Sequence, residues 1–210
     1  MAGQNNAELN ALLKWGITNS DASGSTNQEQ SQAPSGRGLN AQTLNALLGG
    51  PTDADLMRAN MQKIESTEVS LDDRITAFDN LEQLVESIDN ANQLESLSLW
   101  TPLLKQLDSP EIEMRKMAAW CVGTAVQNNV KSQERLLAMD GVGKLAKMAV
   151  QEADAAAKKK SIYALSSSMR NYQPATNEAL KFLPQEIVQA EQVPADDMDK
   201  IDEILNRLRD

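Results

Sequence analysis

An internal repeat constrains the fold of this chain more than any other feature of its sequence. Residues 99–129 align with residues 141–172 so that, after a one-residue slip, Trp120 matches Tyr163. The spacing between the copies is 42 to 43 residues. Repeats of about 40–47 residues with two or three helices each form solenoids, in which every unit buries its apolar face against its neighbours. The chain is therefore predicted to be a stack of helical units.

Each unit is predicted to contain a short first helix, a middle helix and a long third helix. The expected first helices are 93–97 and 133–139, the middle helices 101–108 and 144–152, and the third helices 110–128 and 155–171. Ser109 is expected to cap one third helix, with Pro110 at its first position. We therefore expect an all-α, armadillo-like right-handed superhelix of about two to three repeats with flanking helices. Its third helices would line a concave surface.

An earlier, partial copy of the repeat is predicted at residues 75–92. Its last four residues, DNAN, align with Gln127, Asn128 and Asn129 at a shift of 38 residues. No segment shows a convincing strand alternation.

Capping signals mark two further helices ahead of the repeats. Thr52 followed by Asp55 resembles a capping box and opens a helix to about residue 64. Ser70 followed by Asp73 repeats that signal and opens a helix over residues 71–88.

Three regions follow from these signals. Residues 1–38 are expected to be a flexible segment: a short amphipathic helix at 5–17 and a polar linker that has too little apolar surface to fold. Residues 39–183 are expected to form the repeat domain. Residues 184–210 are expected to supply a C-terminal capping helix at 195–208.

Composition excludes several classes of function. The chain has no histidine and one cysteine, Cys121, so it holds no Ser-His-Asp triad, no Cys-His dyad and no histidine metal ligand. Cys121 lies in an apolar run and is expected to be buried and inert. The net charge of −10 argues against nucleic acid or an anionic membrane as the partner. We expect a cytoplasmic monomer without cofactor, metal or enzymatic activity.

Two short motifs have a structural and a functional interpretation. Residues 141–144 (GVGK) resemble a phosphate loop but lack its upstream glycine spacing, its Ser or Thr and its preceding strand, so a turn into the middle helix is expected. The basic run at residues 158–160 is either a solvated face or a contact for an acidic partner.

Polar residues recur where the third helices are predicted to end. The set is Asn90, Asn92, Asn128, Asn129, Arg170 and Asn171. These residues either terminate helices, where Asn is well tolerated, or form a ladder of hydrogen-bond donors along a binding groove. Near the N-terminus, Leu12, Leu13 and Trp15 either pack as a cap or act as an interaction segment, and the long polar linker favours the second interpretation.

Five sequence segments resemble one known family. They are LNALLKWGITNS, GGPTDADLM, ITAFDNLEQLVESIDNANQLESLSLWTPLL, VGTAVQNNVKSQERLL and IYALSSSMRNY, and they cover most of residues 9–172. The chain resembles the cytosolic fungal Fes-one type nucleotide exchange factors of the heat shock protein 70 (Hsp70) chaperone. These are relatives of the animal Hsp70-binding protein.

The resemblance implies a binding function. Such proteins clasp lobe two of the ATPase domain of Hsp70 with the concave face, promote ADP release and so substrate release. Their N-terminal segment is thought to reach the peptide-binding domain, which here would involve Leu12, Leu13 and Trp15. Among the groove residues, the resemblance points most strongly to Ala91, where a small residue would allow close approach.

One departure and two rival functions remain. Longer family members carry about four repeats, whereas this pattern ends after about Leu183, which puts the register of the contacts in doubt. A generic armadillo scaffold that binds an extended peptide in its groove is the main alternative. An enzyme has no supporting constellation of residues.

Overall fold

Helices make up all the regular secondary structure in residues 50–189 and 192–209, the part of the chain that the computed structural model describes. In chain order they are α3 (Asp53–Glu65), α4 (Leu71–Val85), α5 (Ile88–Ser96), α6 (Trp100–Lys105), the 3₁₀ turn η1 (Gln106–Asp108), α7 (Ile112–Val126), α8 (Val130–Ala138), α9 (Gly141–Gln151), α10 (Ala155–Met169), α11 (Gln173–Leu180), α12 (Gln185–Val188) and α13 (Met198–Arg209). The segment predicted at residues 1–38 lies outside the described residues. The all-α expectation is confirmed for the described ones.

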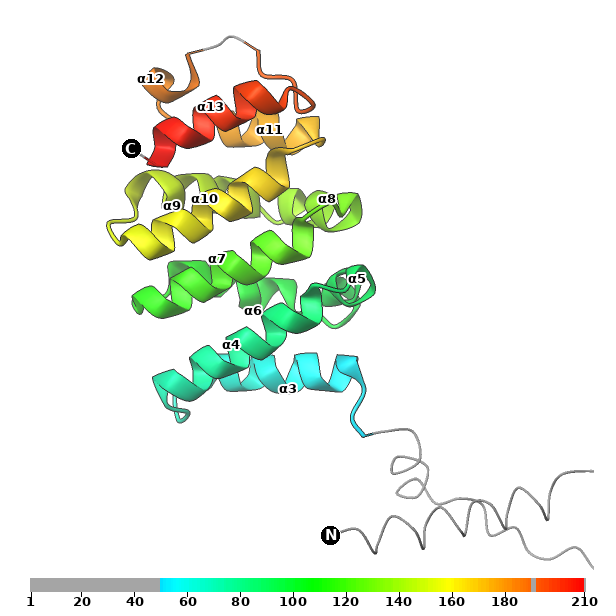
Figure 1. Cartoon of the computed structure of the whole chain (residues 1–210). Helices are drawn as coiled ribbons and strands as arrows, with labels where there is room; N and C mark the ends of the chain where they lie inside the picture. Colours follow the sequence, from blue (N-terminus) through cyan, green and yellow to red (C-terminus); the bar gives the residue numbers. More distant parts are fainter. Residues whose placement is uncertain (1–49, 190–191, 210) are drawn as a thin grey trace, which may run out of the picture. The chain divides into compact units, whose positions relative to one another are not determined.

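The helices stack in the predicted three-helix units. One unit consists of α5, α6 with η1, and α7, and the next consists of α8, α9 and α10. The third helices α4, α7 and α10 follow one another along the stack, and α13 lies over α10 as the next layer (Figure 1). Each unit therefore packs its apolar side chains on the unit before and the unit after it.

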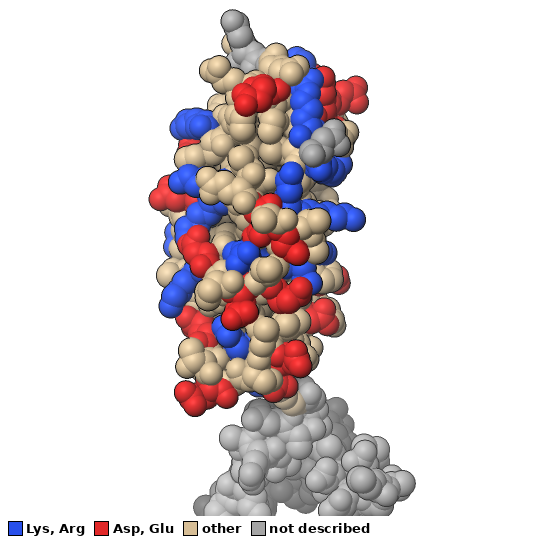
Figure 2. Space-filling view, turned by 90° about the vertical axis from the view of Figure 1, so that its left-hand side faces the viewer, with Lys and Arg blue, Asp and Glu red and all other residues tan. Residues whose placement is uncertain are grey.

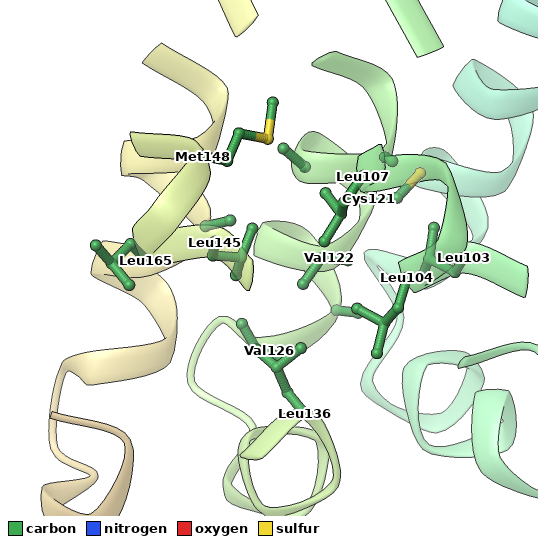
Figure 3. Close-up of a cluster of buried hydrophobic side chains, with 14 of the residues drawn as sticks. Leu103, Leu104, Leu107, Cys121, Val122, Val126, Leu136, Leu145, Met148 and Leu165 are labelled. Carbon is green, nitrogen blue, oxygen red and sulfur yellow. The ribbon is translucent and has the colours of Figure 1, made fainter. Parts of the chain in front are cut away.

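The interior is filled mainly by aliphatic side chains and methionine, and the rings of Phe78 and Trp100 are buried with them. Figure 3 shows one such cluster, which includes Leu103 and Leu107 of the middle layer and Val122 of α7. Cys121 is fully buried among them, as expected, and its thiol lies 3.5 Å from the Phe78 carbonyl oxygen. Burial, chiefly through desolvation, holds the pKa of this thiol well above its ordinary value, so the cysteine is inert.

Both predicted N-terminal caps are present. The Thr52 hydroxyl accepts a hydrogen bond from the Asp55 backbone N–H (3.2 Å), and the Asp55 carboxylate accepts one from the Thr52 N–H (3.3 Å). The Ser70 hydroxyl accepts from the Asp73 N–H at 3.2 Å. These side chains satisfy N–H groups that the first turn of a helix leaves without intrahelical partners.

The start of one third helix was predicted two residues too early. Helix α7 begins at Ile112 with Glu111 as its N-cap, not at Pro110 with Ser109 as the cap. Ser109 is held extended, as a residue before proline tends to be. The carbonyl oxygens of Ser109 and Pro110 instead accept hydrogen bonds from Arg115.

The shift of 38 residues for the first copy was wrong. Helix α4 ends at Val85 and α5 begins at Ile88, so Asn90 lies in the first turn of a first helix. The matching position in α8 is Ser132, 42 residues later. Two residues join α4 to α5, whereas three join α7 to α8. The sequence alone does not show that the first turn is shorter. Both first helices begin before their predicted starts at residues 93 and 133, α5 at Ile88 and α8 at Val130.

The C-terminal helix closes the stack as expected. Helix α13 buries four apolar residues against the preceding layer: Ile201, Ile204, Leu205 and Leu208. It begins at Met198 rather than at residue 195, because the Ala195 carbonyl oxygen accepts a hydrogen bond from the Asn171 N–H (2.8 Å). Asp197 then accepts from the Lys200 N–H (3.1 Å) and provides the cap.

A buried ion pair joins two successive units. Arg115 Nε lies 2.7 Å from Glu152 Oε2 and Arg115 Nη2 lies 3.0 Å from Glu152 Oε1, a two-point contact. The Glu152 side chain is only 6% exposed. The hydrogen bond from Arg115 holds the pKa of Glu152 below its ordinary value, against the opposing effect of burial. The pair thus fixes the start of α7 to the turn before α10.

We expect Arg115→Ala to lower the free energy of unfolding by about 2–3 kcal/mol, because it leaves a buried carboxylate without its counter-charge. Urea unfolding measures this loss. The difference from wild type should be present above pH 4.5, the ordinary pKa of a glutamate, and disappear as the pH falls through the lowered pKa of Glu152.

The control is Arg58→Ala, which removes a pair with Asp55 in which both side chains are at least half exposed. Its loss should be about 0.5 kcal/mol or less. Equal losses in the two variants would contradict the role given to the Arg115 pair.

Candidate binding groove on the third helices

An open pocket lies where α4, α7 and α10 present their outer sides to solvent. Its volume is about 450 Å³. We call it the third-helix groove, and it is lined by Glu82, Glu86, Ile88, Trp120, Thr124, Gln127, Asn128 and Tyr163. Ligand pockets in proteins have volumes of about 300–1,000 Å³, so the groove is large enough to hold a side chain of a partner.

Two aromatic residues form the centre of the groove. Trp120 of α7 and Tyr163 of α10 occupy matching repeat positions, as predicted, and each is partly exposed rather than fully buried. The Tyr163 hydroxyl donates to Gln127 Oε1 at 3.2 Å, which ties α10 to the end of α7. Exposed rings held in this way offer a rigid contact surface at little entropic cost.

Lys160 lies over these rings. Its Nζ is 3.3 Å from the centroid of the Trp120 ring and 5.9 Å from that of Tyr163. Desolvation is the main reason that its pKa is lowered. The basic run at 158–160 therefore has mixed surroundings, with Lys160 half-buried on the aromatic centre and Lys159 exposed.

Gly123 sets the position of Tyr163. A Cβ atom at this position would lie 2.6 Å from Cε1 of the Tyr163 ring and 3.0 Å from the Ala164 Cα. The missing side chain lets α7 and α10 approach closely, and the ring rests on the α7 backbone. A side chain here would push Tyr163 away from Trp120.

Glu82 of α4 is a buried carboxylate in the wall of the groove. It is 5% exposed, and its Oε1 accepts a hydrogen bond from the Thr124 hydroxyl at 2.6 Å. No ion pair to Glu82 occurs among residues 50–189 and 192–209. Desolvation raises the pKa of Glu82, and the Thr124 hydrogen bond opposes that rise only in part.

The predicted ladder of polar residues does not form one row. Asn128 lines the groove, and it shares with Asn171 a left-handed backbone (φ of 53° and 58°) in matching turns. Asn129 is 6% exposed and caps α8 by accepting from the Ser132 N–H at 3.4 Å. Arg170 pairs with Asp202 and so is directed toward α13.

The DNAN residues are placed elsewhere. Asn90 is 6% exposed and donates to Asp53 Oδ2 (2.9 Å) and to the Leu84 carbonyl oxygen (3.0 Å), so it joins α5 to α3 and α4. Ala91 is 2% exposed and so is packed within the fold, and its part in the partner contact stays a prediction. Asn92 is partly buried in α5. Leu12, Leu13 and Trp15 lie outside the described residues.

The comparisons with known proteins agree with one another. The family model described as "Nucleotide exchange factor Fes1" matches residues 9–94, and that described as "SIL1/FES1/HPBP1 C-terminal domain" matches residues 90–190. The Hsp70 nucleotide exchange factor FES1 of Gibberella zeae is 51% identical over 206 residues, which are 96% of this chain and 95% of the relative. The chain belongs to the Fes1 family.

The matched share of the relatives varies. The Fes1 protein of Coccidioides immitis is 46% identical, and the match covers 97% of this chain and 98% of that one. The Schizosaccharomyces pombe protein matches over 58% of this chain and 42% of its own length. An engineered protein of known structure superposes with a TM-score of 0.59 over 80% of this chain and 71% of its own, at 16% identity, which supports the fold alone.

Three features concern metal binding, membrane spanning and the distribution of surface charge. Within residues 50–189 and 192–209, no three His, Cys, Asp or Glu side chains are grouped to hold a metal ion. Over the same residues, no helix is both long and apolar enough to cross a membrane. Figure 2 shows one side of the stack, where acidic and basic side chains are interspersed rather than gathered into one basic field.

Sequence reasoning missed most of the groove. Glu82 and Ile88 were assigned to a single helix without a binding role, although Ile88 is 55% exposed. The available signal was the repeat match of Trp120 with Tyr163.

We expect Glu82→Gln to stabilise the fold by roughly 0.5 kcal/mol at pH 7, because the ionised carboxylate is desolvated without a paired cation. The amide oxygen still accepts from Thr124. The raised pKa means that wild-type Glu82 takes up a proton before an ordinary glutamate does, so the gain should shrink as the pH falls through that raised pKa. Urea unfolding between pH 4 and pH 8, roughly the range over which such a group titrates, measures the difference.

Glu86→Gln serves as the control, since Glu86 is exposed and its change should stay within about 0.5 kcal/mol. A marked loss of stability in Glu82→Gln would show that the carboxylate contributes to folding instead.

Proposed function

We propose that this chain, an Hsp70 nucleotide exchange factor of the Fes1 family, binds lobe two of the Hsp70 ATPase domain with the solvent-exposed face of its third helices. The observation that supports the proposal is the third-helix groove, with its aromatic centre at Trp120 and Tyr163 and a buried carboxylate at Glu82. We further propose that the protein acts as a monomer in the cytoplasm.

The mechanism is thermodynamic linkage. A partner that binds the open ATPase domain more tightly than the closed one must weaken nucleotide binding by the same coupling free energy. ADP then leaves faster, ATP rebinds and the substrate is released. No bond is made or broken by the exchange factor, so the protein needs a rigid, complementary surface rather than catalytic groups.

We expect Gln127→Arg to slow exchange at subsaturating concentration about tenfold or more, since it places a bulky cation inside the groove. Gln127 is exposed at the end of α7, so the fold should tolerate the change. The measurement is stopped-flow release of fluorescent ADP from a cytosolic Hsp70.

The matched control is Gln151→Arg, the same substitution at an exposed residue that ends α9 in the middle-helix layer. It should match wild type within about twofold. Loss of exchange in both variants would contradict the placement of the interface, and no acceleration by wild type would contradict the exchange role. Ala91→Arg is a poorer probe, because Ala91 is buried and the variant would misfold.

The N-terminal segment is proposed to contact the peptide-binding domain of Hsp70 through Leu12, Leu13 and Trp15. Replacing all three by alanine should leave ADP release unchanged and slow the release of a fluorescent peptide substrate severalfold, because the apolar anchors would be lost. If the triple substitution slowed ADP release and peptide release equally, these residues would act through the ATPase domain. That result would contradict the proposal.

A peptide-binding scaffold is the second candidate. Trp120, which is partly exposed, and Asn128 both line the groove, and this favours it, because a side-chain amide beside an aromatic ring can hold the backbone of an extended peptide. A scaffold would bind unfolded peptides and leave ADP release unaffected, so the same assay separates the two functions.

A further inference from the structure

We propose that the third-helix groove receives a long basic side chain of the Hsp70 partner, with arginine preferred over lysine. This inference rests on the proposed function and specifies the chemistry by which the groove recognises its partner.

The charge of the lining supports a cation. Glu82 and Glu86 are the charged residues of the lining, and both are acidic. Glu82 is 5% exposed, and its Oε1 accepts from Thr124 while Oε2 accepts no hydrogen bond from the described residues. A carboxylate held in this way at the edge of a pocket has an acceptor available to an incoming N–H donor.

The uncharged part of the lining fits the rest of such a side chain. The Trp120 and Tyr163 rings line the groove, and the ammonium of Lys160 already covers one face of Trp120 at 3.3 Å from the ring centroid, so an incoming cation stacks elsewhere on the two rings or displaces Lys160. Lys160 itself is not part of the lining. Ile88, 55% exposed, provides apolar surface for a methylene chain. A planar guanidinium stacks on aromatic rings better than an ammonium does, which favours arginine.

The groups that face Glu82 predict a pH signature. Desolvation raises its pKa most, the Thr124 hydrogen bond and Lys160 lower it, and Glu86 and Asp79 raise it by repulsion. The Cys121 thiol, which also lies near Glu82, is neutral because burial raises its pKa. A bound cation stabilises the ionised carboxylate, so binding should weaken as the pH falls through the raised pKa of Glu82.

The experiment is calorimetric titration of the full chain with the Hsp70 ATPase domain, together with the ADP-release assay. The variants are Glu82→Gln and Glu86→Gln, which remove charge with little change of shape. Glu68→Gln, an exposed acid in the turn between α3 and α4, is the matched control for net charge. Each groove variant should raise Kd about tenfold, and the control should stay within about twofold.

The release rate with Glu68→Gln should match that with wild type, and melting curves check that each variant is folded. A competition arm uses N-acetylarginine amide against the uncharged N-acetylcitrulline amide. The first should weaken binding of wild type but not of the double variant Glu82→Gln/Glu86→Gln.

Failure of the proposed function and failure of the basic-side-chain inference give different results. If wild type neither binds the ATPase domain nor accelerates release, the proposed function fails. If wild type does both, while the groove variants match Glu68→Gln or the two amides compete equally, the exchange role stands and the basic-side-chain inference is overturned.

Discussion

The close contact of α7 with α10 at Gly123 is the constraint on which the groove depends. Because no side chain separates the helices there, the Tyr163 ring rests on the α7 backbone, beside Trp120 and within reach of Gln127. The same approach lets the buried apolar side chains of both helices pack against one another in the layer beneath. A solenoid needs such contacts between neighbours at every step, and this step also shapes its outer surface.

In α4, the requirements of folding stability and those of the proposed partner binding conflict. Most polar groups that this fold buries are satisfied: Asn90 reaches Asp53 and Leu84, and Arg115 pairs with Glu152 at two points. Glu82 differs, because one hydrogen bond from Thr124 offsets only part of its desolvation. A group that costs folding free energy yet faces an open pocket is the kind of residue that binding sites retain.

The sequence predicted those elements whose signals are local. Periodicity and the caps at Thr52 and Ser70 placed α3 and α4, and the repeat placed the layers of α6 to α10. It failed where a turn changes length by one residue, since that shift moved Asn90 and Ala91 from a helix end into a buried first turn.

The groove was not predictable in the same way. Its lining comes from helices about 40 residues apart, and a single sequence does not show which side of each helix faces solvent. Trp120 and Tyr163 were correctly matched, yet their partial exposure follows from the packing at Gly123, which a pattern of letters does not reveal.

The closure of the stack by α13 bears on how such chains vary. Arg170 and the Asn171 backbone attach α13 and the segment before it to the end of α10, whereas the groove is built from α4, α7 and α10. None of the residues that line the groove belongs to α13. A change of length beyond α10 is therefore modular, because it leaves the lining of the groove as it is.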